Sequence, residues 1–220
     1  MISRTFAIGD IHGCFSSFQK LVESELKLQK TDKLILLGDY MDRGSQSKQV
    51  IDYIIELLRQ DYDIIPLRGN HEGLLLDAYY DSSQIPLWIF NGGQSTLNSF
   101  GISEIADIDP FYIDFFANLA YYYQDDNFLF VHAGFNDELE DPFSDTYHMI
   151  WHCRISYDNP RLADMTVIHG HCPITLSQLN ENLKINKRII DIDTGCVYAG
   201  NYGYGHLSAI EINTLNLFSV

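Results

Sequence analysis

The stretch KLILLGDYMDRG, residues 33–44, joins an apolar run to a cluster of charged side chains. Two other stretches in the first third of the chain have the same order, TFAIGD at 5–10 and DIIPLRGN at 63–70. Apolar residues at helical spacing follow each of them, over 15–28, 50–58 and 74–78. This alternation predicts an α/β sheet with short loops at the carboxyl ends of its strands.

The remainder of the chain divides into two regions. Residues 83–123 read as helical and loop-rich, with a break at NGGQ, 91–94. Strand-like runs then return as NFLFVHAG (127–134), TVIHGH (166–171), RIIDIDTG (188–195), HLSAIEI (206–212) and LNLFSV (215–220). No linker rich in Gly, Ser or Pro divides the chain, so we expect a single domain over residues 1–220.

Composition limits the classes of partner. The chain is 46% hydrophobic, enough for a large core, and its net charge of −16 should repel nucleic acid. No apolar run approaches the ~20 residues of a membrane span, and the N-terminus lacks the pattern of a signal peptide. The four cysteines (Cys14, Cys153, Cys172, Cys196) form no CxxC pair, so we expect them to be reduced, buried side chains. These features predict a cytoplasmic protein that does not contact membranes.

Side chains that bind metals follow the apolar runs. They occur in GDIHG (Asp10, His12), GDYMDRG (Asp39, Asp42, Arg43), GNHE (Asn70, His71), FVHAG (His132) and IHGHC (His171). Carboxylates that share one crevice repel one another and lose hydration, and bound cations offset both costs. A set of Asp, Asn and His without thiolate suits Mn, Fe or Zn.

A pair of such ions has a specific chemistry. Two ions ~3.5–4 Å apart that share a carboxylate can stabilise both the attacking and the leaving oxygen of a phosphoryl displacement. The leaving oxygen needs a proton and the phosphoryl oxygens need positive charge, which His71 and Arg43 are placed to supply. The residues therefore predict a binuclear site for phosphoester hydrolysis.

The ordered series GDIHG, GDYMDRG, GNHE, HAG and GHCP resembles the PPP-type metallophosphoesterase family, and within it the compact bacterial and phage serine/threonine protein phosphatases. The resemblance implies one α/β domain, a two-sheet β-sandwich flanked by helices. Asp10 and His12 would bind the first metal, and Asp39 would bridge both. The second metal would be bound by Asn70, His132 and His171.

The resemblance also implies the roles of the residues around the metals. Asp42 would hold His71, the general acid, and Arg43 would bind the phosphate together with Arg154 of MIWHCRI. His169 would either pack or support the ligands, and Asp-Thr-Gly at 193–195 would have a structural rather than a catalytic role. The segment LWIFNGGQSTLNSFG, 87–101, resembles one that lies beside the active site in the bacterial members.

The reaction implied is hydrolysis of phosphoserine and phosphothreonine by direct attack of a hydroxide that bridges two divalent ions, with Mn²⁺ expected and Fe or Zn as alternatives. The partner is then a phosphorylated protein or a small phosphoester. Three other functions stay open: a dinucleoside tetraphosphate hydrolase of the same fold, a phosphodiesterase or nuclease, and a non-enzymatic module that binds phosphorylated partners. The net charge argues against the nuclease, and the His71–Asp42 pair argues against the module. The oligomeric state is left open.

Overall fold

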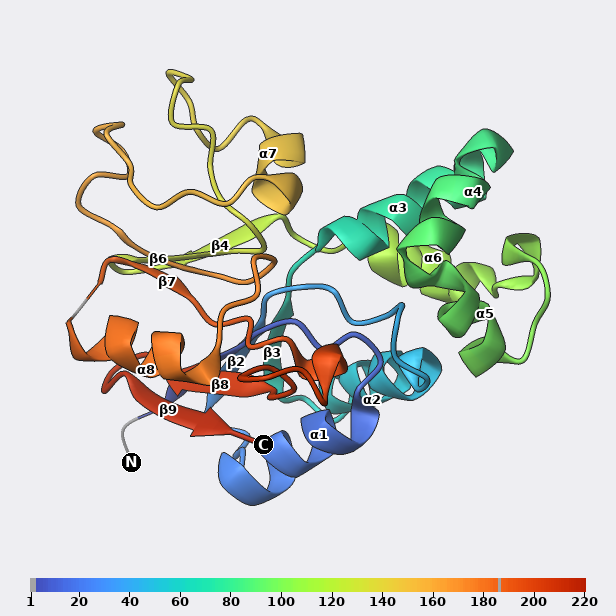
Figure 1. Cartoon of the computed structure of the whole chain (residues 1–220), viewed down its shortest axis with the longest axis horizontal. Coiled ribbons are helices and arrows are strands. Elements are labelled where there is room, and N and C mark those ends of the chain that lie inside the picture. Colours follow the sequence, from blue (N-terminus) through green and yellow to red (C-terminus); the bar gives the residue numbers. More distant parts are fainter. Residues whose placement is uncertain (1–2, 186) are drawn as a thin grey trace.

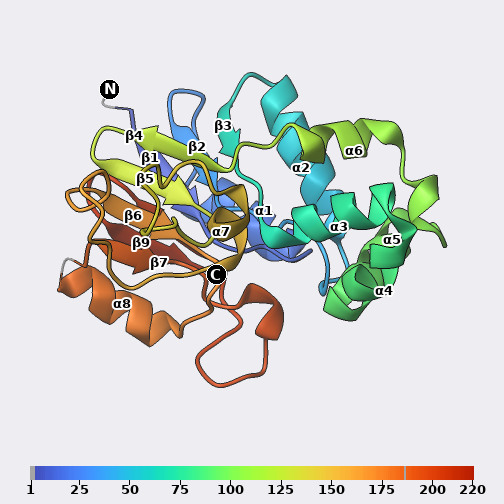
Figure 2. The same cartoon turned by 90° about the horizontal axis from the view of Figure 1, so that it is seen from above.

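The computed structural model describes residues 3–185 and 187–220, which form two sheets packed face to face with helices on the outside (Figures 1 and 2). The first sheet has the order β3-β2-β1-β8-β9 and the second has the order β4-β5-β6-β7. The predicted two-sheet α/β sandwich is confirmed. Its strands are β1 (Thr5–Ile8), β2 (Lys33–Leu36), β3 (Asp63–Pro66), β4 (Tyr122–Asp125), β5 (Phe128–Val131), β6 (Thr166–His169), β7 (Ile189–Asp191), β8 (Ser208–Glu211) and β9 (Asn216–Ser219).

Parallel pairing brings the loops that carry the motifs to one edge of the sandwich. Strands β1, β2 and β3 run parallel to one another, and so do β5, β6 and β7. The antiparallel strands β8, β9 and β4 extend the two sheets. His132, after β5, donates from Nδ1 to the carbonyl of Leu37, after β2, over 2.9 Å. The carboxyl ends of both parallel sets therefore meet.

Alternation along the strands builds two apolar layers on the first sheet. In β1, Phe6 and Ile8 pack among the helices, whereas Ala7 faces the space between the sheets. Ile35 of β2 meets Phe130 and Ile168 of the second sheet in that space. Because the parallel strands are buried on both faces, their sequences are nearly continuous apolar runs.

The helices cover the outer faces and begin close to the motifs. In Figure 1, α3 to α6 gather on one side of the sandwich, and α7 lies beyond the second sheet. The α-helices are α1 (Phe15–Lys20), α2 (Ser47–Arg59), α3 (Asn70–Tyr80), α4 (Ile85–Trp88), α5 (Gln94–Phe100), α6 (Pro110–Ala117), α7 (Thr146–Trp151) and α8 (Leu176–Lys184). The π-helical segments are η1 (Leu21–Glu25) and η3 (Ile89–Gly93), and the 3-10 helices are η2 (Ser82–Gln84), η4 (Ile105–Asp107) and η5 (Cys196–Tyr198).

Two boundaries differ from the sequence expectation. The predicted break at 91–94 is a bend between η3 and α5, where Gly92 adopts a φ of 111°. The helical middle region stops before residue 122, because Tyr122–Asp125 pair with β5 as strand β4. Alternating exposure along this edge strand gives it no continuous apolar run for sequence reasoning to detect.

The cysteine expectation is wrong for one pair. Cys153 and Cys172 form a disulfide with their Cα atoms 6.6 Å apart, and Cys172 is exposed rather than buried. Cys14 and Cys196 remain free, and only Cys196 is buried. Across residues 3–185 and 187–220, no helix has the length and apolar character that a membrane crossing requires.

Candidate metal centre

The six predicted metal ligands gather where the two sheets meet. All are buried except His171, which is half-buried. They come from the loop after β1 (Asp10, His12), the loop after β2 (Asp39), the first turn of α3 (Asn70), the loop after β5 (His132) and the loop after β6 (His171). Segments more than 150 residues apart in sequence are thus joined, since the amide of His171 donates to Asp10 Oδ1 over 3.2 Å.

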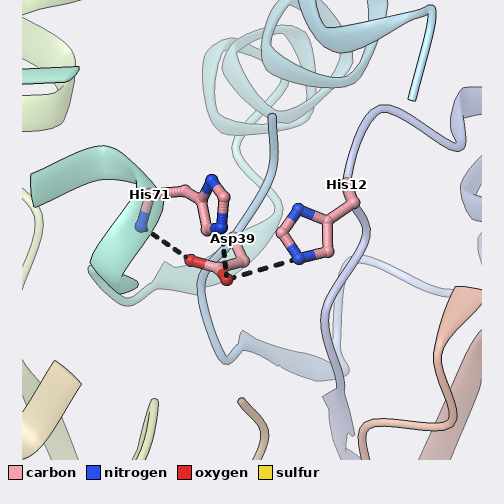
Figure 3. A group of neighbouring side chains, drawn as sticks. All are labelled: His12, Asp39 and His71. Atoms are coloured by element: carbon pink, nitrogen blue, oxygen red, sulfur yellow. Dashed lines mark hydrogen bonds and ion pairs between the residues drawn. The ribbon is translucent and has the colours of Figure 1, made fainter. Parts of the chain in front are cut away.

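One group of potential ligands consists of His12, Asp39 and His71 (Figure 3). His12 Nε2 lies 3.4 Å from Asp39 Oδ2, and His71 Nε2 lies 3.9 Å from the same oxygen. His12 Nδ1 donates to the carbonyl of Met41 over 2.9 Å, which leaves the Nε2 lone pair directed at the centre. This is the tautomer that a metal-binding histidine needs.

The second group consists of Asp39, His132 and His171, with Asn70 beside them. His132 Nε2 lies 2.9 Å from Asn70 Oδ1, 3.1 Å from His171 Nδ1 and 3.5 Å from Asp39 Oδ1. Because His132 Nδ1 donates to a backbone carbonyl, its Nε2 is an acceptor that faces two oxygen acceptors. These acceptor atoms converge with no hydrogen to share between them, so a cation bound among them would be favourable.

Asp39 is a member of both groups, as its expected bridging role requires. Burial alone would raise the pKa of Asp39, but the surrounding histidines, His132 foremost, hold it below its ordinary value. Its carboxylate is therefore ionised in a buried position, where a divalent cation would compensate the charge.

Asp10 lies beside these groups, in a cluster of carboxylates. Its two oxygens accept from the amide of His171 at 3.2 and 3.3 Å. Burial and the nearby carboxylates of Asp193 and Asp39 raise the pKa of Asp10 well above its ordinary value. Sequence reasoning assigned Asp193 only a structural role, although its strand end repeats the apolar-run-then-acid order of the motifs. Three buried carboxylates in one place again fit a cation-binding centre.

The histidines predicted to be ligands are held in the neutral form that binds metals. Burial lowers the pKa of His12 to about 3 and that of His171 to about 4. Burial also lowers the pKa of His132. At neutral pH these rings therefore keep a lone pair directed into the centre.

His71 is set apart from the other histidines by its partner. Its Nδ1 donates to Asp42 Oδ2 over 2.8 Å, and both side chains are fully buried. Burial lowers the pKa of His71, but the carboxylates of Asp39 and Asp42 outweigh burial and raise it above the ordinary value. Its Nε2 is buried and has no hydrogen-bond partner among residues 3–185 and 187–220. His71 can thus carry a proton on a nitrogen that faces the centre, as a general acid must.

The Asp42 carboxylate is itself fixed by two side chains that sequence reasoning missed. Thr96 Oγ1 donates to Asp42 Oδ1 over 2.6 Å, and Trp88 Nε1 donates to Oδ2 over 3.0 Å. Both side chains are fully buried, and both lie within the 83–123 region. Both lie in LWIFNGGQSTLNSFG, 87–101, the segment that the resemblance places beside the active site, but sequence reasoning singled out neither residue, because they reach Asp42 only through the packing of α4 and α5.

The two predicted phosphate-binding arginines have different positions. Arg43 is exposed, and its Nη1 lies 2.8 Å from His12 Nε2, at the mouth of the centre. Arg154 instead lies with Nη2 3.5 Å from Glu138. Within residues 3–185 and 187–220, no hydrogen bond joins Arg154 to a predicted ligand. The structure therefore brings Arg43, but not the Arg154 side chain, to the ligand groups.

Glu72 explains why the sequence places Asn, His and Glu together at the start of α3. Its Oε1 accepts from the amide of Tyr40, and its Oε2 accepts from the amides of Asp39 and Gly69, all at 2.8–2.9 Å. This buried carboxylate ties the Asp39 loop to the first turn of α3. Sequence reasoning gave Glu72 no role, although a Glu at the third helical position is a known capping signal.

Backbone strain is concentrated at the centre. Nine non-glycine residues in the described ranges have positive φ, and five of them are predicted site residues: His12, Asp39, Asp42, Arg43 and His171. Each costs on the order of 1–3 kcal/mol unless the surroundings enforce it. Such strain is typical of functional sites, where the loops are held in the geometry that a ligand needs.

The chain is similar to several known proteins. Serine/threonine-protein phosphatase 1 of Salmonella typhimurium is 41% identical over 88 residues, which are 40% of this chain and 38% of that protein. Bis(5'-nucleosyl)-tetraphosphatase PrpE [asymmetrical] of Geobacillus sp. is 28% identical over 88% of this chain and 86% of its own length. A protein serine/threonine phosphatase from Saccharomyces cerevisiae superimposes with a TM-score of 0.66 at 15% identity, covering 99% of this chain and 79% of that one, which shows a common fold.

The family model described as calcineurin-like phosphoesterase matches residues 3–207, nearly the whole chain. That range contains every predicted ligand, the His71–Asp42 pair and Arg43. The chain belongs to the calcineurin-like phosphoesterase family.

Proposed function

We propose that this phosphoesterase hydrolyses phosphate monoesters, with phosphoserine and phosphothreonine of proteins as its substrates, and that it uses two divalent ions, Mn²⁺ first among them. One observation carries the proposal: two groups of potential ligands share Asp39, and His71 Nε2 lies 3.9 Å from the same carboxylate. An alkyl oxygen is a poor leaving group, so a buried acid beside the metals suits serine and threonine esters.

The metal ions, when bound, supply a nucleophile from water at neutral pH and neutralise charge on the phosphoryl oxygens. Asp10, His12 and Asp39 would hold one ion, and Asp39, Asn70, His132 and His171 would hold the other. Arg43 binds a phosphoryl oxygen from the mouth of the centre, where its guanidinium already lies beside His12. His71 protonates the leaving oxygen while Asp42 keeps the imidazole in the correct tautomer.

A second candidate is hydrolysis of dinucleoside tetraphosphates. The supporting observation is the similarity to the Geobacillus protein of that name, which extends over 88% of this chain. The 88-residue similarity to the Salmonella phosphatase is higher in identity but covers only 40% of the chain. Both reactions use the same ligands, so the choice between them depends on what binds around the centre.

A side-by-side turnover assay separates the candidates. The manganese-loaded protein is given a phosphoserine peptide, a dinucleoside tetraphosphate and a phosphodiester, and kcat/KM is measured for each. We expect the highest kcat/KM for the phosphopeptide. A tetraphosphate preference of about tenfold or more, equivalent to about 1.4 kcal/mol, would assign the protein to the second candidate. His71→Asn is the inactive reference, and His152→Asn, an exposed histidine outside both ligand groups, is the matched control.

A further inference from the structure

A cavity of about 480 Å³ lies beside the metal centre, on the outer face of the second sheet. Its floor includes His169 of β6 and Ile189 and Asp191 of β7. The segment between α7 and β6 covers it and contributes Arg154, Ile155, Tyr157 and Met165. The volume is within the range of pockets that bind small molecules.

The charge of the cavity is opposite to that of the protein. Arg154, Lys187 and Arg188 line it, and Asp191 is the only acid among the lining residues in the described part of the chain. Burial and the neighbouring Asp193 raise the pKa of Asp191 well above its ordinary value, which disfavours a negative charge there. A chain with 30 acids and 14 bases thus directs three of those bases into one cavity.

The ion pairs of these bases are weak. Arg154 lies 3.5 Å from Glu138, and Arg188 lies 3.6 Å from Asp164. Both carboxylates are almost fully exposed, so the pairs contribute little and an incoming anion can replace them. Arginine binds phosphate oxygens through paired N–H groups, which makes phosphate the anion that this set fits best.

The rest of the cavity suits a planar heterocycle. Its walls are mostly apolar or aromatic, and they include Ile155, Tyr157, Leu162, Met165, Ile174 and Ile189. Asn182 of α8 and the buried His169 add polar side chains that can bind the edge of a heterocycle. Apolar walls with a few polar groups are typical of sites that bind nucleosides and cofactors.

The cavity is connected to the metal centre through one short segment. Cys172 lines the cavity and directly follows His171, a predicted ligand of the second metal. Its disulfide partner Cys153 also lines the cavity, and the Cys153 sulfur lies 3.7 Å from the carbonyl of Gly170. The disulfide therefore lies on the side of the cavity next to His171.

We propose that this cavity binds a nucleoside phosphate, with the phosphates on Arg154, Lys187 and Arg188 and the base between the apolar walls. This binding does not depend on which reaction the metal centre performs. The bound nucleotide is either a free nucleotide or the leaving half of a dinucleotide substrate.

Equilibrium binding tests the proposal. Manganese-loaded protein is titrated with an ATP analogue that carries an imido bridge between the β and γ phosphates. Lys187→Glu should weaken binding by about tenfold or more, because it replaces a charge-assisted contact with repulsion. The matched control is Lys184→Glu, the same change at an exposed site on α8 outside the cavity, and it should alter the dissociation constant less than about twofold.

The apolar wall has its own pair of variants. Ile155 is 97% exposed and lines the cavity, whereas Ile185 is 66% exposed and does not, so both tolerate a polar side chain in the fold. Ile155→Glu should weaken binding of the analogue about as much as Lys187→Glu does, whereas Ile185→Glu should leave binding unchanged. Equal effects of the cavity variants and their controls would overturn the proposal. Loss of all binding on chelation of the metals, with the cavity variants indistinguishable from wild type, would also overturn it.

Kinetics then identify the source of the nucleotide. If the cavity holds the leaving half of a dinucleotide, Lys187→Glu lowers kcat/KM for a dinucleoside tetraphosphate about tenfold and leaves phosphopeptide hydrolysis unchanged. If it holds a free nucleotide, the variant loses analogue binding while kcat/KM for both substrates stays at the wild-type value. Either result supports nucleotide binding in the cavity, and phosphopeptide turnover reports on the metal centre separately.

Discussion

Replacement of His71 by Asn tests the chemistry of the centre most directly. In the native protein, His71 Nδ1 donates to Asp42 over 2.8 Å, and its Nε2 faces Asp39 with no other partner. His71 is assigned to proton donation and not to either metal. We therefore expect His71→Asn to keep both metals and to lose turnover.

The size of the loss depends on the leaving group. General acid catalysis contributes about 10²–10⁴-fold, which corresponds to roughly 3–5.5 kcal/mol of transition-state stabilisation. The leaving group of a phosphoserine peptide is the serine alkoxide, which needs the proton. The kcat for this substrate should therefore fall by the full factor. Nitrophenolate leaves without a proton, so kcat for nitrophenyl phosphate should fall only about tenfold.

The assay compares kcat for the two substrates at saturating manganese, with metal content measured on the same protein. Because the His71 side chain is fully buried, a thermal melt must show that the variant is folded. His152→Asn controls for the loss of an imidazole elsewhere. Equal losses on both substrates would refute the role of His71 as a leaving-group acid, and loss of a metal would make it a ligand instead.

Three further changes test the supporting structure. Asp39→Asn should lower the metal content below that of Asp42→Asn, since Asp39 belongs to both ligand groups whereas the Asp42 carboxylate accepts from the side chains of His71, Trp88 and Thr96. Metal analysis after reloading that shows the opposite order would reverse the two assignments. Glu72→Gln keeps one oxygen acceptor and replaces the other with an NH2 donor, which then faces at least one of the three backbone N–H groups. Urea denaturation should therefore show a loss of about 1–3 kcal/mol in the free energy of unfolding, and an unchanged midpoint would contradict this. Cys172→Ser opens a loop whose ends are 19 residues apart and should reduce the free energy of unfolding by about 3 kcal/mol under oxidising conditions, with no difference from wild type once the Cys153 bond is reduced.

Much of the candidate centre could be predicted because its predicted ligands follow recognisable strands. Local periodicity marks the strands, and the carboxyl ends of parallel strands share one edge, so Asp10, Asp39 and His132 were expected to converge. The structure brings them together with Asn70 and His171. The finer assignments of metals and substrate stay predictions.

Other features depend on contacts that no local pattern records. Trp88 and Thr96 reach Asp42 from helices 46 and 54 residues away. Cys153 and Cys172 pair because the segment after α7 folds back over β6. Arg154 was assigned from its place after Trp151, but its side chain turns toward Glu138 and the adjacent cavity.

The sequence by itself determined the strand–loop–helix order, the two-sheet class and the identity of the side chains that can bind metals. These properties depend on residue type and short-range spacing, because the spacing of apolar residues matches the periodicity of the helix or strand that buries them. Only the tertiary structure decided the left-handed backbone at five site residues, the hydrogen bonds that hold Asp42 and Glu72, and the basic cavity beside His171. They arise where two sheets and their loops pack, because the free energy of that packing enforces conformations and contacts that each segment alone would not adopt.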